Sequence, residues 1–336
     1  IPYNGDHFIL TNKKRKYDES MRFLEKIFKK LFKKPEFNKQ NITYIKKVER
    51  DLKKFTGLEF NLINRLKKRL VSFKVDYNFY LKLLKKRKPK KIYIVVSNIL
   101  HPLIAAAKEL GIEVIEIQHG TILKNHLAYH FPDYKKGVPY FPDKMIMYGK
   151  YWYDNVNIPL PEDNIIYKRS QILQNKKKEY GKYDKNENQV LFLSQGTIGA
   201  ELSKTAYLFA KDFDQYKIIY KLHPEEYSHW ENSYPYLKKA RKLKNFIIVD
   251  DDKKELYKLL ANSKYQVGVY TTALYEGIVM GCSTVLLDLP GVELMDYLID
   301  NNYASLAKDH MELKNKIESI ASKKINSDYF YYDSSK

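Results

Sequence analysis

Residues 91–120 read KIYIVVSNILHPLIAAAKELGIEVIEIQHG, and this stretch decides the fold class. Its two ends, KIYIVVS and IEVIEIQHG, contain short apolar runs rich in β-branched residues, which predict buried strands. The middle, 101–111, has the spacing of a helix and ends at Gly111, the residue type that most often follows a last helical turn. A strand, a helix and a second strand form a βαβ unit, which implies a parallel sheet. We therefore expect an α/β protein.

The alternation of strands and helices continues along the chain. KMIMYG (144–149) and NIIYKR (164–169) predict further strands of the first sheet. A second series consists of QVLFLSQ, YKIIYKLHP, FIIVDDD, YQVGVYTT and TVLLDLPG. Between the two series, residues 174–188 are polar and unpatterned, which favours a linker. We expect two Rossmann-like domains facing a cleft, at residues 1–178 and 188–336.

From about Asp18 to Lys91 the sequence is strongly basic and has helical periodicity. In MRFLEKIFKKLFKK (21–34) apolar side chains recur every three or four residues, as one face of a helix requires. NLINRLKKRLVSF (61–73) repeats the pattern with Leu62, Leu66 and Leu70 one turn apart. Two interpretations stay open: the apolar stripe packs against the rest of its domain, or it docks on an anionic membrane surface.

The charge balance favours an anionic partner or neighbourhood. The 336 residues include 60 Lys and Arg against 40 Asp and Glu, a formal net charge of +20. Nucleic acid, a phospholipid surface and phosphate-bearing small molecules would all suit this excess. The sequence lacks the run of about 18 apolar residues that a transmembrane helix needs. The single cysteine, Cys282, fits a reducing cytoplasm and a buried structural thiol.

Polar side chains stand where four of the expected strands end. In open α/β sheets, ligands bind outside the carboxyl ends of the strands, so these are the candidate site residues. They are Gln118-His119-Gly120, Ser194-Gln195-Gly196-Thr197, His223-Pro224, and Thr271-Thr272 with Glu276 one turn later.

Each of these groups has a chemical and a structural interpretation. The 194–197 turn opens a helix and exposes N–H groups to an anion, although it is neither a Walker A sequence nor a GxGxxG fingerprint. Lys221 and His223 alternate onto one face of a strand and could contact a phosphate, while Pro224 ends the strand. The alternatives are a helix cap for the turn and a loop role for the histidine.

The segment VGVYTTALYEGIVMG, 267–281, is the most informative of them. Thr271 and Thr272 would begin a helix with their hydroxyls near the cleft, and Glu276 could reach a ribose diol. The structural alternative makes the threonines simple caps and Glu276 a solvated helix residue.

Two other kinds of site are not supported. His101, His126 and His130 lie close in the sequence, but no HExxH, CxxC or carboxylate cluster accompanies them, so we expect no metal. A serine hydrolase is not expected either, since no GxSxG elbow occurs.

Taken together, QHG (118–120), KLHP (221–224) and TTALYEG (271–277) resemble motifs of GT-B glycosyltransferases of bacterial and archaeal surface-polysaccharide synthesis. The closest resemblance is to the sialyltransferase-like and capsule-synthesis groups, which use CMP-activated sugars. It covers residue 91 to the end and implies a GT-B-like fold preceded by a basic helical region.

The resemblance also implies roles for residues on the donor side. In the sialyltransferase families the histidine of His-Pro contacts the donor phosphate, which corresponds to His223 beside Pro224. A Ser/Thr pair does the same, which corresponds to Thr271 and Thr272, and the GT-B glutamate that holds the nucleotide ribose corresponds to Glu276. The remaining expected donor-side residues are Ser194, Gln195, Gly196, Thr197 and Lys221.

The expected base departs from the sialyltransferase pattern. Those enzymes place an acidic residue before a glycine, whereas this chain has His119 before Gly120. Teichoic-acid glycerophosphate and ribitol-phosphate transferases share the His-Gly, His-Pro and Ser/Thr set, and their first histidine is the proposed base. A near-neutral imidazole suits proton abstraction from a hydroxyl, and glycine permits close backbone approach. We expect His119 to be the base, with Glu116 as the alternative.

The sequence therefore predicts a glycosyltransferase of cell-surface polysaccharide synthesis. The expected donor is a CMP-activated sialic-acid-like or other acidic sugar, the acceptor a glycan or lipid-linked sugar, and the reaction inverting and metal-independent without a cofactor. We expect a cytoplasmic protein, with peripheral contact to an anionic membrane as a possibility. The alternatives are a CDP-alditol phosphotransferase and a non-catalytic basic nucleic-acid-binding protein. No nucleic-acid motif favours the last, so nucleic acid is not an expected partner.

Overall fold

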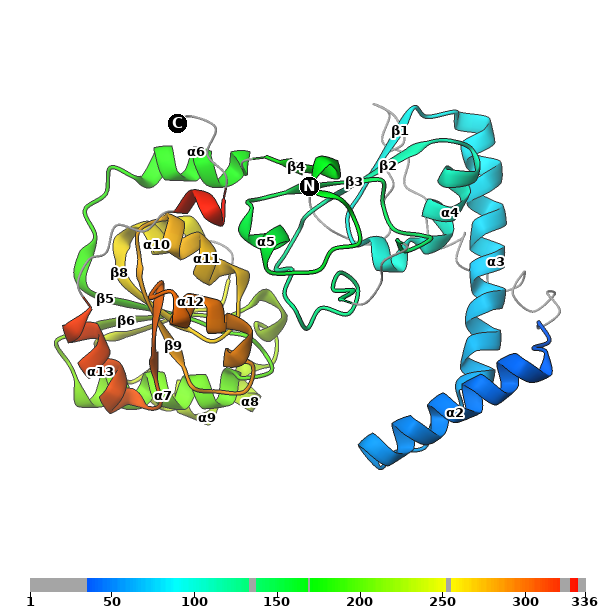
Figure 1. The fold of residues 1–336 in the computed structure, drawn as a ribbon. Coiled ribbons are helices and arrows are strands. Elements are labelled where there is room, and N and C mark those ends of the chain that lie inside the picture. Colours follow the sequence, from blue (N-terminus) through cyan, green and yellow to red (C-terminus); the bar gives the residue numbers. More distant parts are fainter. Residues whose placement is uncertain (1–34, 133–136, 169, 252–254, 321–326, 332–336) are drawn as a thin grey trace. The chain divides into compact units, whose positions relative to one another are not determined.

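The computed structural model describes residues 35–132, 137–168, 170–251, 255–320 and 327–331 (Figure 1). The expected helix at 21–34 lies outside them. The chain forms two compact units, one of Ile1–Ile117 with Lys136–Met145 and one of Gln118–Lys135 with Ile146–Lys336. The division expected at residues 178 and 188 stays a prediction. Across the described ranges, no helix is long and apolar enough to span a bilayer.

The first sheet has the strand order β1-β2-β3-β4 and confirms the expected βαβ unit. Its strands are β1 (Lys91–Ile94), β2 (Glu113–Ile117), β3 (Lys144–Met147) and β4 (Ile165–Tyr167). β1 and β2 are parallel, with Lys91 opposite Glu113. Between them lie η1 (Ser97–Ile99) and α4 (His101–Glu109).

The first unit is anchored by a core between α4, β1, β2 and the end of a long helix. That helix, α3 (Leu62–Arg87), contributes Leu84, which packs with Leu103 and Ile104 of α4 and with Ile94 and Val114 of the strands. Alanines at 106 and 107 are fully buried, which lets α4 approach closely. Only the carboxyl-terminal part of α3 belongs to this core.

The amino-terminal part of α3, which follows helix α2 (Lys39–Thr56), bears on the two interpretations of the apolar stripe. The stripe of leucines at 62, 66 and 70 was expected to be a packed or membrane-docking face. In the structure Leu66 and Leu70 are exposed, and the buried residues of α3 are Val71, Val75 and Leu84. Periodicity identified the helix correctly, but it could not tell whether a partner surface covers the stripe.

The second sheet has six parallel strands in the order β10-β9-β8-β5-β6-β7. They are β5 (Asn186–Leu193), β6 (Lys217–Lys221), β7 (Phe246–Val249), β8 (Ser263–Gly268), β9 (Ser283–Leu287) and β10 (Ala304–Ala307). From β5 the chain winds outward through β6 and β7, and then returns to β8 on the other side of β5. The order reverses between β5 and β8, which makes the carboxyl ends of these two strands the topological switch point.

Helices cover both faces of the second sheet (Figure 1). One face packs against α7, α9 and α13 in a core that includes Phe192, Phe209 and Leu313. The other lies under α10 and α11. The helices of this unit are α5 (Tyr151–Asp154), α6 (Gln171–Tyr180), α7 (Gly199–Asp212), α8 (Trp230–Ser233), α9 (Pro235–Ala240), α10 (Leu256–Asn262), α11 (Thr272–Val279), α12 (Asp296–Asp300) and α13 (His310–Ser319). Its short 3-10 turns are η2 (Glu162–Asn164), η3 (Pro224–Glu226), η4 (Val292–Met295) and η5 (Ser327–Tyr329).

One expectation about local structure was wrong, and one strand was not predicted. Residues 174–188 are not a linker, because α6 extends to Tyr180 and β5 begins at Asn186. Most of their polar side chains are exposed, on the solvent side of α6 or at the start of β5. Composition alone does not distinguish such positions from a loop. The edge strand β10 was missed, since ASLA is too short and small-residued to give a periodic signal.

A buried glutamine ties α11 to the second sheet. The Gln266 side chain is fully buried, and its Nε2 donates to the Leu274 carbonyl at 2.7 Å and to Thr284 Oγ1 at 2.8 Å. Gly277 passes directly over the same amide, where an added Cβ would overlap it. Gly277 is therefore needed for close packing of α11 on the sheet.

We predict that Gly277→Ala destabilises the protein by about 1–3 kcal/mol through overpacking. The collision outweighs the roughly 1 kcal/mol that alanine gains over glycine in a helix interior. Urea denaturation measures the difference. Gly196→Ala is the control, because its new Cβ would have its nearest neighbour at 3.9 Å, and its stability should match wild type. Equal stability of both variants would contradict the packing argument.

Candidate functional site

The carboxyl ends of β5, β6 and β8 bring together most of the expected donor-side residues. The 194–197 turn follows β5, His223 follows β6, and Thr271 precedes α11 shortly after β8. Because these strands are neighbours in the sheet, their ends meet at one edge. The topological switch point lies within this group, where a ligand is expected on general grounds.

A buried carboxylate, Glu226, connects the ends of β5 and β6. Its side chain is fully buried and accepts hydrogen bonds from Ser194 Oγ at 2.9 Å, from Tyr234 Oη at 2.7 Å and from the backbone N–H of His223 at 2.7 Å. Gly199 leaves room for this cluster, since a Cβ there would strike both the Tyr234 ring and Glu226 Oε1. Ser194 is thus committed to internal bonding and positions the turn that follows it.

His223 presents its imidazole outward from this buried cluster. The side chain is 45% exposed, and its Nδ1 accepts a hydrogen bond from the backbone N–H of Glu225 at 3.4 Å. In a neutral imidazole an accepting Nδ1 leaves the proton on Nε2. His223 can therefore donate from Nε2 to an anion, and Pro224 begins the short helix η3 that sets the ring's direction.

Lys221 points away from the exposed edge. Its side chain is buried, and Nζ donates to the carbonyls of Leu222 at 3.3 Å and Asp251 at 3.1 Å and contacts the hydroxyl of Tyr227. Lys221 is the last residue of β6 and His223 follows it by two residues, but the structure does not bring their side chains together. Lys221 instead ties the end of β6 to the segment after β7.

The turn after β5 leads directly to the switch point. Gly196 and Thr197 are exposed, Gln195 is partly buried, and the Ile198 N–H closes the turn on the Gln195 carbonyl at 3.0 Å. The hydroxyl of Thr197 contacts that of Tyr270, which comes just after β8. This contact joins the two loops on either side of the reversal in strand order.

The first residues of α11 are capped as the sequence suggested. Thr271 Oγ1 accepts a hydrogen bond from the Ala273 N–H at 3.4 Å, and Thr272 is the first helical residue. Both threonines are partly exposed. The helix therefore offers its positive end at the same edge of the sheet as His223 and the 194–197 turn.

Glu276 lies one turn into α11 in an environment of tyrosines. Loss of hydration raises the pKa of its carboxyl to about 7, partly offset by a hydrogen bond with Tyr257. The charge of Glu276 in turn raises the pKa of Tyr148, Tyr257 and Tyr331, for which burial is the larger cause. Tyr148 and Tyr331 stack with their ring centroids 5.3 Å apart. Glu276 is a largely buried acid with a pKa of about 7, so it can gain or lose a proton near neutral pH.

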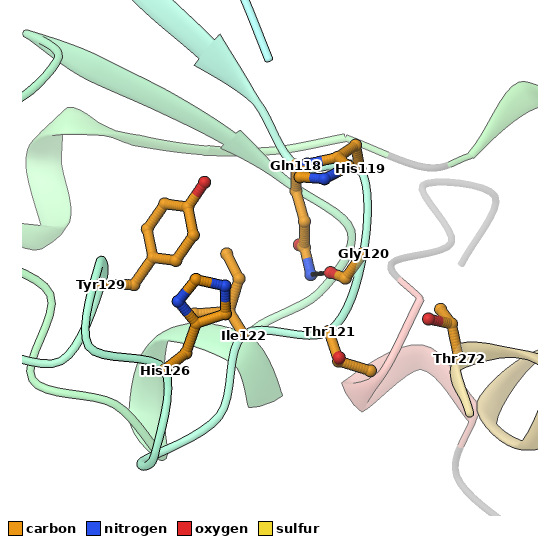
Figure 2. Close-up of a pocket in the computed structure, with 8 residues that line it drawn as sticks. All are labelled: Gln118, His119, Gly120, Thr121, Ile122, His126, Tyr129 and Thr272. Carbon is orange, nitrogen blue, oxygen red and sulfur yellow. Dashed lines mark hydrogen bonds between the residues drawn. The ribbon is translucent and has the colours of Figure 1, made fainter. Parts of the chain in front are cut away.

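The loop after β2 forms a pocket of about 250 Å³ (Figure 2). Gln118 is buried, and its amide fixes the loop: Oε1 accepts from the Tyr148 N–H at 3.0 Å, and Nε2 donates to the Gly120 carbonyl at 2.8 Å. His119, between Gln118 and Gly120, is exposed and lines the pocket. The pocket therefore joins His119 and Gly120 with Thr272 from the start of α11, all within the second unit.

The pocket lining also includes residues outside the expected site, namely Thr121, Ile122, His126 and Tyr129. His126 and Tyr129 line the pocket, with ring centroids 4.7 Å apart, on the side away from Thr272 (Figure 2). His126 was considered only as a metal ligand, and among the described residues no group of three His, Cys, Asp or Glu could hold a metal ion. Their place opposite Thr272 depends on how the loop folds, which no motif indicates.

Glu116 has a different environment from His119. It is fully buried in β2, and its Oε1 accepts from the Ser97 backbone N–H at 3.0 Å. This bond holds the turn after β1. The two candidate bases therefore differ in exposure: Glu116 is buried in the sheet, and His119 is exposed at the pocket.

Comparisons with known proteins match the architecture. The UDP-GlcNAc 2-epimerase from Methanocaldococcus jannaschii is 12% identical, with 78% of this chain and 79% of that chain covered and a TM-score of 0.52. Its complex with UDP-GlcNAc and UDP is 13% identical, covering 78% and 77%, with a TM-score of 0.52. A Listeria monocytogenes protein provisionally named UDP-N-acetylglucosamine 2-epimerase is 11% identical, covering 78% and 74%, with a TM-score of 0.52.

The chain has a GT-B-like fold. Two parallel α/β sheets, of four and six strands, confirm the fold class expected from the sequence. A scan against protein-family models finds no match, and a search of the curated proteins finds none either. At 11–13% identity the structural likeness establishes the fold and leaves the activity to be argued from the site.

We predict that Tyr234→Phe lowers the free energy of unfolding by about 1–3 kcal/mol, because the buried Glu226 Oε1 loses one of its two hydroxyl donors and keeps only Ser194. Burial and the bond to Glu226 raise the pKa of Tyr234, so its hydroxyl is a donor at neutral pH. Tyr236→Phe is the matched control: its ring faces Lys204 and Lys239, and phenylalanine keeps those contacts. Urea denaturation of both variants decides the matter, and equal losses would remove the special role of Glu226.

We predict that the free energy of unfolding depends on pH because of the raised pKa of Glu276. Its pKa is raised from 4.5 to about 7 on folding, so the folded state binds the proton more tightly than the unfolded state. Stability should therefore fall as pH rises from 4.5 to 7 and level off above 7. Glutamine does not titrate, so wild type should lose stability relative to Glu276→Gln as pH rises through that window. A difference that is constant with pH would contradict the raised pKa.

Proposed function

We propose that this protein is a nucleotide-sugar-dependent glycosyltransferase that binds its donor nucleotide over the carboxyl ends of β5, β6 and β8. The observation that supports this most is the grouping of His223, the 194–197 turn and the start of α11 at the switch point of the second sheet. This is the place in an open α/β sheet where ligands bind.

The donor phosphates are the first part of the proposed complex. His223 offers an N–H from Nε2, and α11 offers its positive N-terminus with the hydroxyl of Thr272. Exposed Gly196 leaves the backbone of the 195–197 turn open to close approach. These groups can balance the charge that develops on a departing phosphate. Lys221 has no part in this proposal because its amine is bonded inside the unit.

The ribose is the second part. Glu276 lies one turn after Thr272, and its carboxylate could accept hydrogen bonds from both hydroxyls of a ribose diol. An ionised carboxylate is the better acceptor, so nucleotide binding would draw the proton from Glu276. The raised pKa of about 7 means that this proton release occurs within an accessible pH range.

The reaction itself would be a direct displacement. His119, exposed at the pocket on the loop that the Gln118 amide fixes, would take the proton from an acceptor hydroxyl as the sugar's bond to phosphate breaks. Glu116 is the weaker candidate because it is fully buried and bonded to the backbone of Ser97. A single displacement inverts the anomeric centre. The resemblance of the motifs favours a CMP-activated acidic sugar and a glycan or lipid-linked acceptor of surface-polysaccharide synthesis.

A second function has one specific observation in its favour. Two of the solved structures with a TM-score of 0.52 are named UDP-GlcNAc 2-epimerase, one of them in complex with UDP-GlcNAc and UDP. We therefore keep nucleotide-sugar epimerisation as the alternative, ahead of CDP-alditol phosphate transfer. An epimerase would change the sugar without an acceptor, whereas a transferase needs one.

Calorimetric titration with CMP, CDP, UDP and GDP tests the donor site. We expect CMP to bind best, and His223→Ala to weaken binding at least tenfold because a charge-assisted phosphate contact is lost. His119→Ala should keep donor affinity and abolish transfer. His229→Ala, an exposed histidine six residues beyond His223, is the control and should bind as wild type.

The outcomes separate the proposals. Preference for UDP, with a sugar product formed in the absence of acceptor, would favour epimerisation. Equal donor affinity for the His223 and His119 variants would contradict the division of roles, and no binding of any nucleotide would refute the enzyme proposal.

A further inference from the structure

The α2–α3 hairpin, residues 39–87, is mostly outside the packed body of the first unit. The core around α4 takes up Leu84 of α3, and the other buried residues of that helix are Val71 and Val75. Residues 62–70 include no buried side chain, and α2 has a single one, Ile45. Figure 1 shows α2 crossing α3 at the helix end far from α4. Among the residues that the structure describes, the hairpin therefore has little apolar cover.

The tip of this hairpin exposes large apolar side chains. Phe55 is 91% exposed and Leu58 is 63% exposed, on either side of the turn at Gly57. Tyr44, Leu66 and Leu70 add further exposed apolar area on the two helices. Single exposed apolar residues are ordinary, but several on one projecting element mark an interaction surface.

The tip is a defined structure held by three contacts. Gly57 has φ 72°, and its N–H bonds to the Lys53 carbonyl at 2.8 Å. The N–H of Leu62 donates to Glu49 Oε1 at 2.6 Å, which fastens the start of α3 to α2. An ion pair of Lys53 with Glu59 spans the turn. The apolar side chains are therefore presented by a fixed turn.

The surface around the tip is strongly basic. Residues 39–90 hold 17 Lys and Arg against four Asp and Glu. Lys54, Arg65, Lys68 and Arg69 are exposed near the tip. Each basic residue close to an anionic bilayer adds to the attraction between the protein and the lipid headgroups. Nucleic acid would match this charge, but it would leave the aliphatic Leu58 and Leu70 without a suitable contact.

We propose that the α2–α3 hairpin docks on an anionic phospholipid bilayer. Phe55 and Leu58 enter the boundary between headgroups and acyl chains, and the flanking lysines and arginines lie in the headgroup layer. This combination of inserted apolar side chains and a basic rim is the physical basis of interfacial binding. The proposal does not depend on the nucleotide site, because every residue it uses lies in the first unit.

Tryptophan emission of the full chain tests insertion. The native Trp152 and Trp230 are 0% and 1% exposed, so their emission is already that of buried indole. Phe55→Trp adds an exposed indole, and we expect its emission to shift to the blue with phosphatidylglycerol-rich vesicles and to be quenched by brominated acyl chains. Ile172→Trp, at a 62% exposed position on α6, is the matched control and should show neither change.

Co-sedimentation tests affinity. We expect wild type to pellet with phosphatidylglycerol-rich vesicles, to pellet far less with phosphatidylcholine alone, and to lose binding as salt rises. The double variant Phe55→Ser with Leu58→Ser should bind at least tenfold more weakly, while Ile172→Ser should bind as wild type. Both variants should keep wild-type nucleotide titrations, so failure here and failure of the nucleotide site are distinguishable.

Three results would overturn the proposal. Blue emission from the indole of the Phe55→Trp variant before vesicles are added would mean that another part of the chain or a second copy covers the tip, and dilution would separate these two. Unchanged vesicle binding of the double variant would reduce the contact to surface charge alone. Binding to an oligonucleotide but not to vesicles would assign the surface to nucleic acid.

Discussion

The buried carboxylate of Glu226 is the interaction on which the donor side of the proposed site depends. It accepts hydrogen bonds from Ser194, from Tyr234 and from the backbone of His223, so the loops after β5 and β6 are held to one group inside the protein. A buried carboxylate without donors would be strongly unfavourable, and three donors make this arrangement the stable one. Gly199 belongs to the same constraint, because any side chain there would occupy the space of the Tyr234 ring. Because Glu226 holds the backbone of His223, the imidazole of His223 stays exposed at the surface.

The loop after β2 follows the same logic on a smaller scale. Gln118 is buried and bonded to Gly120 and to the backbone of Tyr148, so its amide holds the loop and leaves His119 exposed between two fixed residues. In both places a buried polar side chain precedes or follows a histidine by one to three residues. The chemistry-bearing histidine is thus positioned by backbone contacts, while its own ring stays available to a ligand.

The two units use basic charge differently. In the second unit Lys221 is internal, bonded to backbone carbonyls, and the groups that we assign to the donor phosphates are an imidazole, hydroxyls and a helix N-terminus. In the first unit the lysines and arginines of the α2–α3 hairpin are exposed around an apolar tip. The high net charge therefore gives no direct measure of phosphate binding at the site. It fits our two proposals, in which the hairpin of the first unit binds a bilayer and the second unit binds the donor nucleotide.

Much of the fold could be predicted from the sequence, because the buried strands of a parallel sheet are continuous apolar runs, and four of the expected strands end at distinctive polar groups. The strands, the parallel sheets and the strand-end position of His119, His223 and Thr271 are local properties of the chain. Glu226 had a sequence signal that we did not use: it stands three residues after His223, as in a capping box, although histidine replaces the usual serine or threonine. The environment of Glu276 had none, since Tyr148, Tyr257 and Tyr331 are far apart in the sequence. Only the tertiary structure decided that Lys221 turns inward while His223 turns outward, and that Leu66 and Leu70 stay uncovered. Those outcomes depend on which distant segments pack against each side chain, and periodicity along one segment carries no information about its partners.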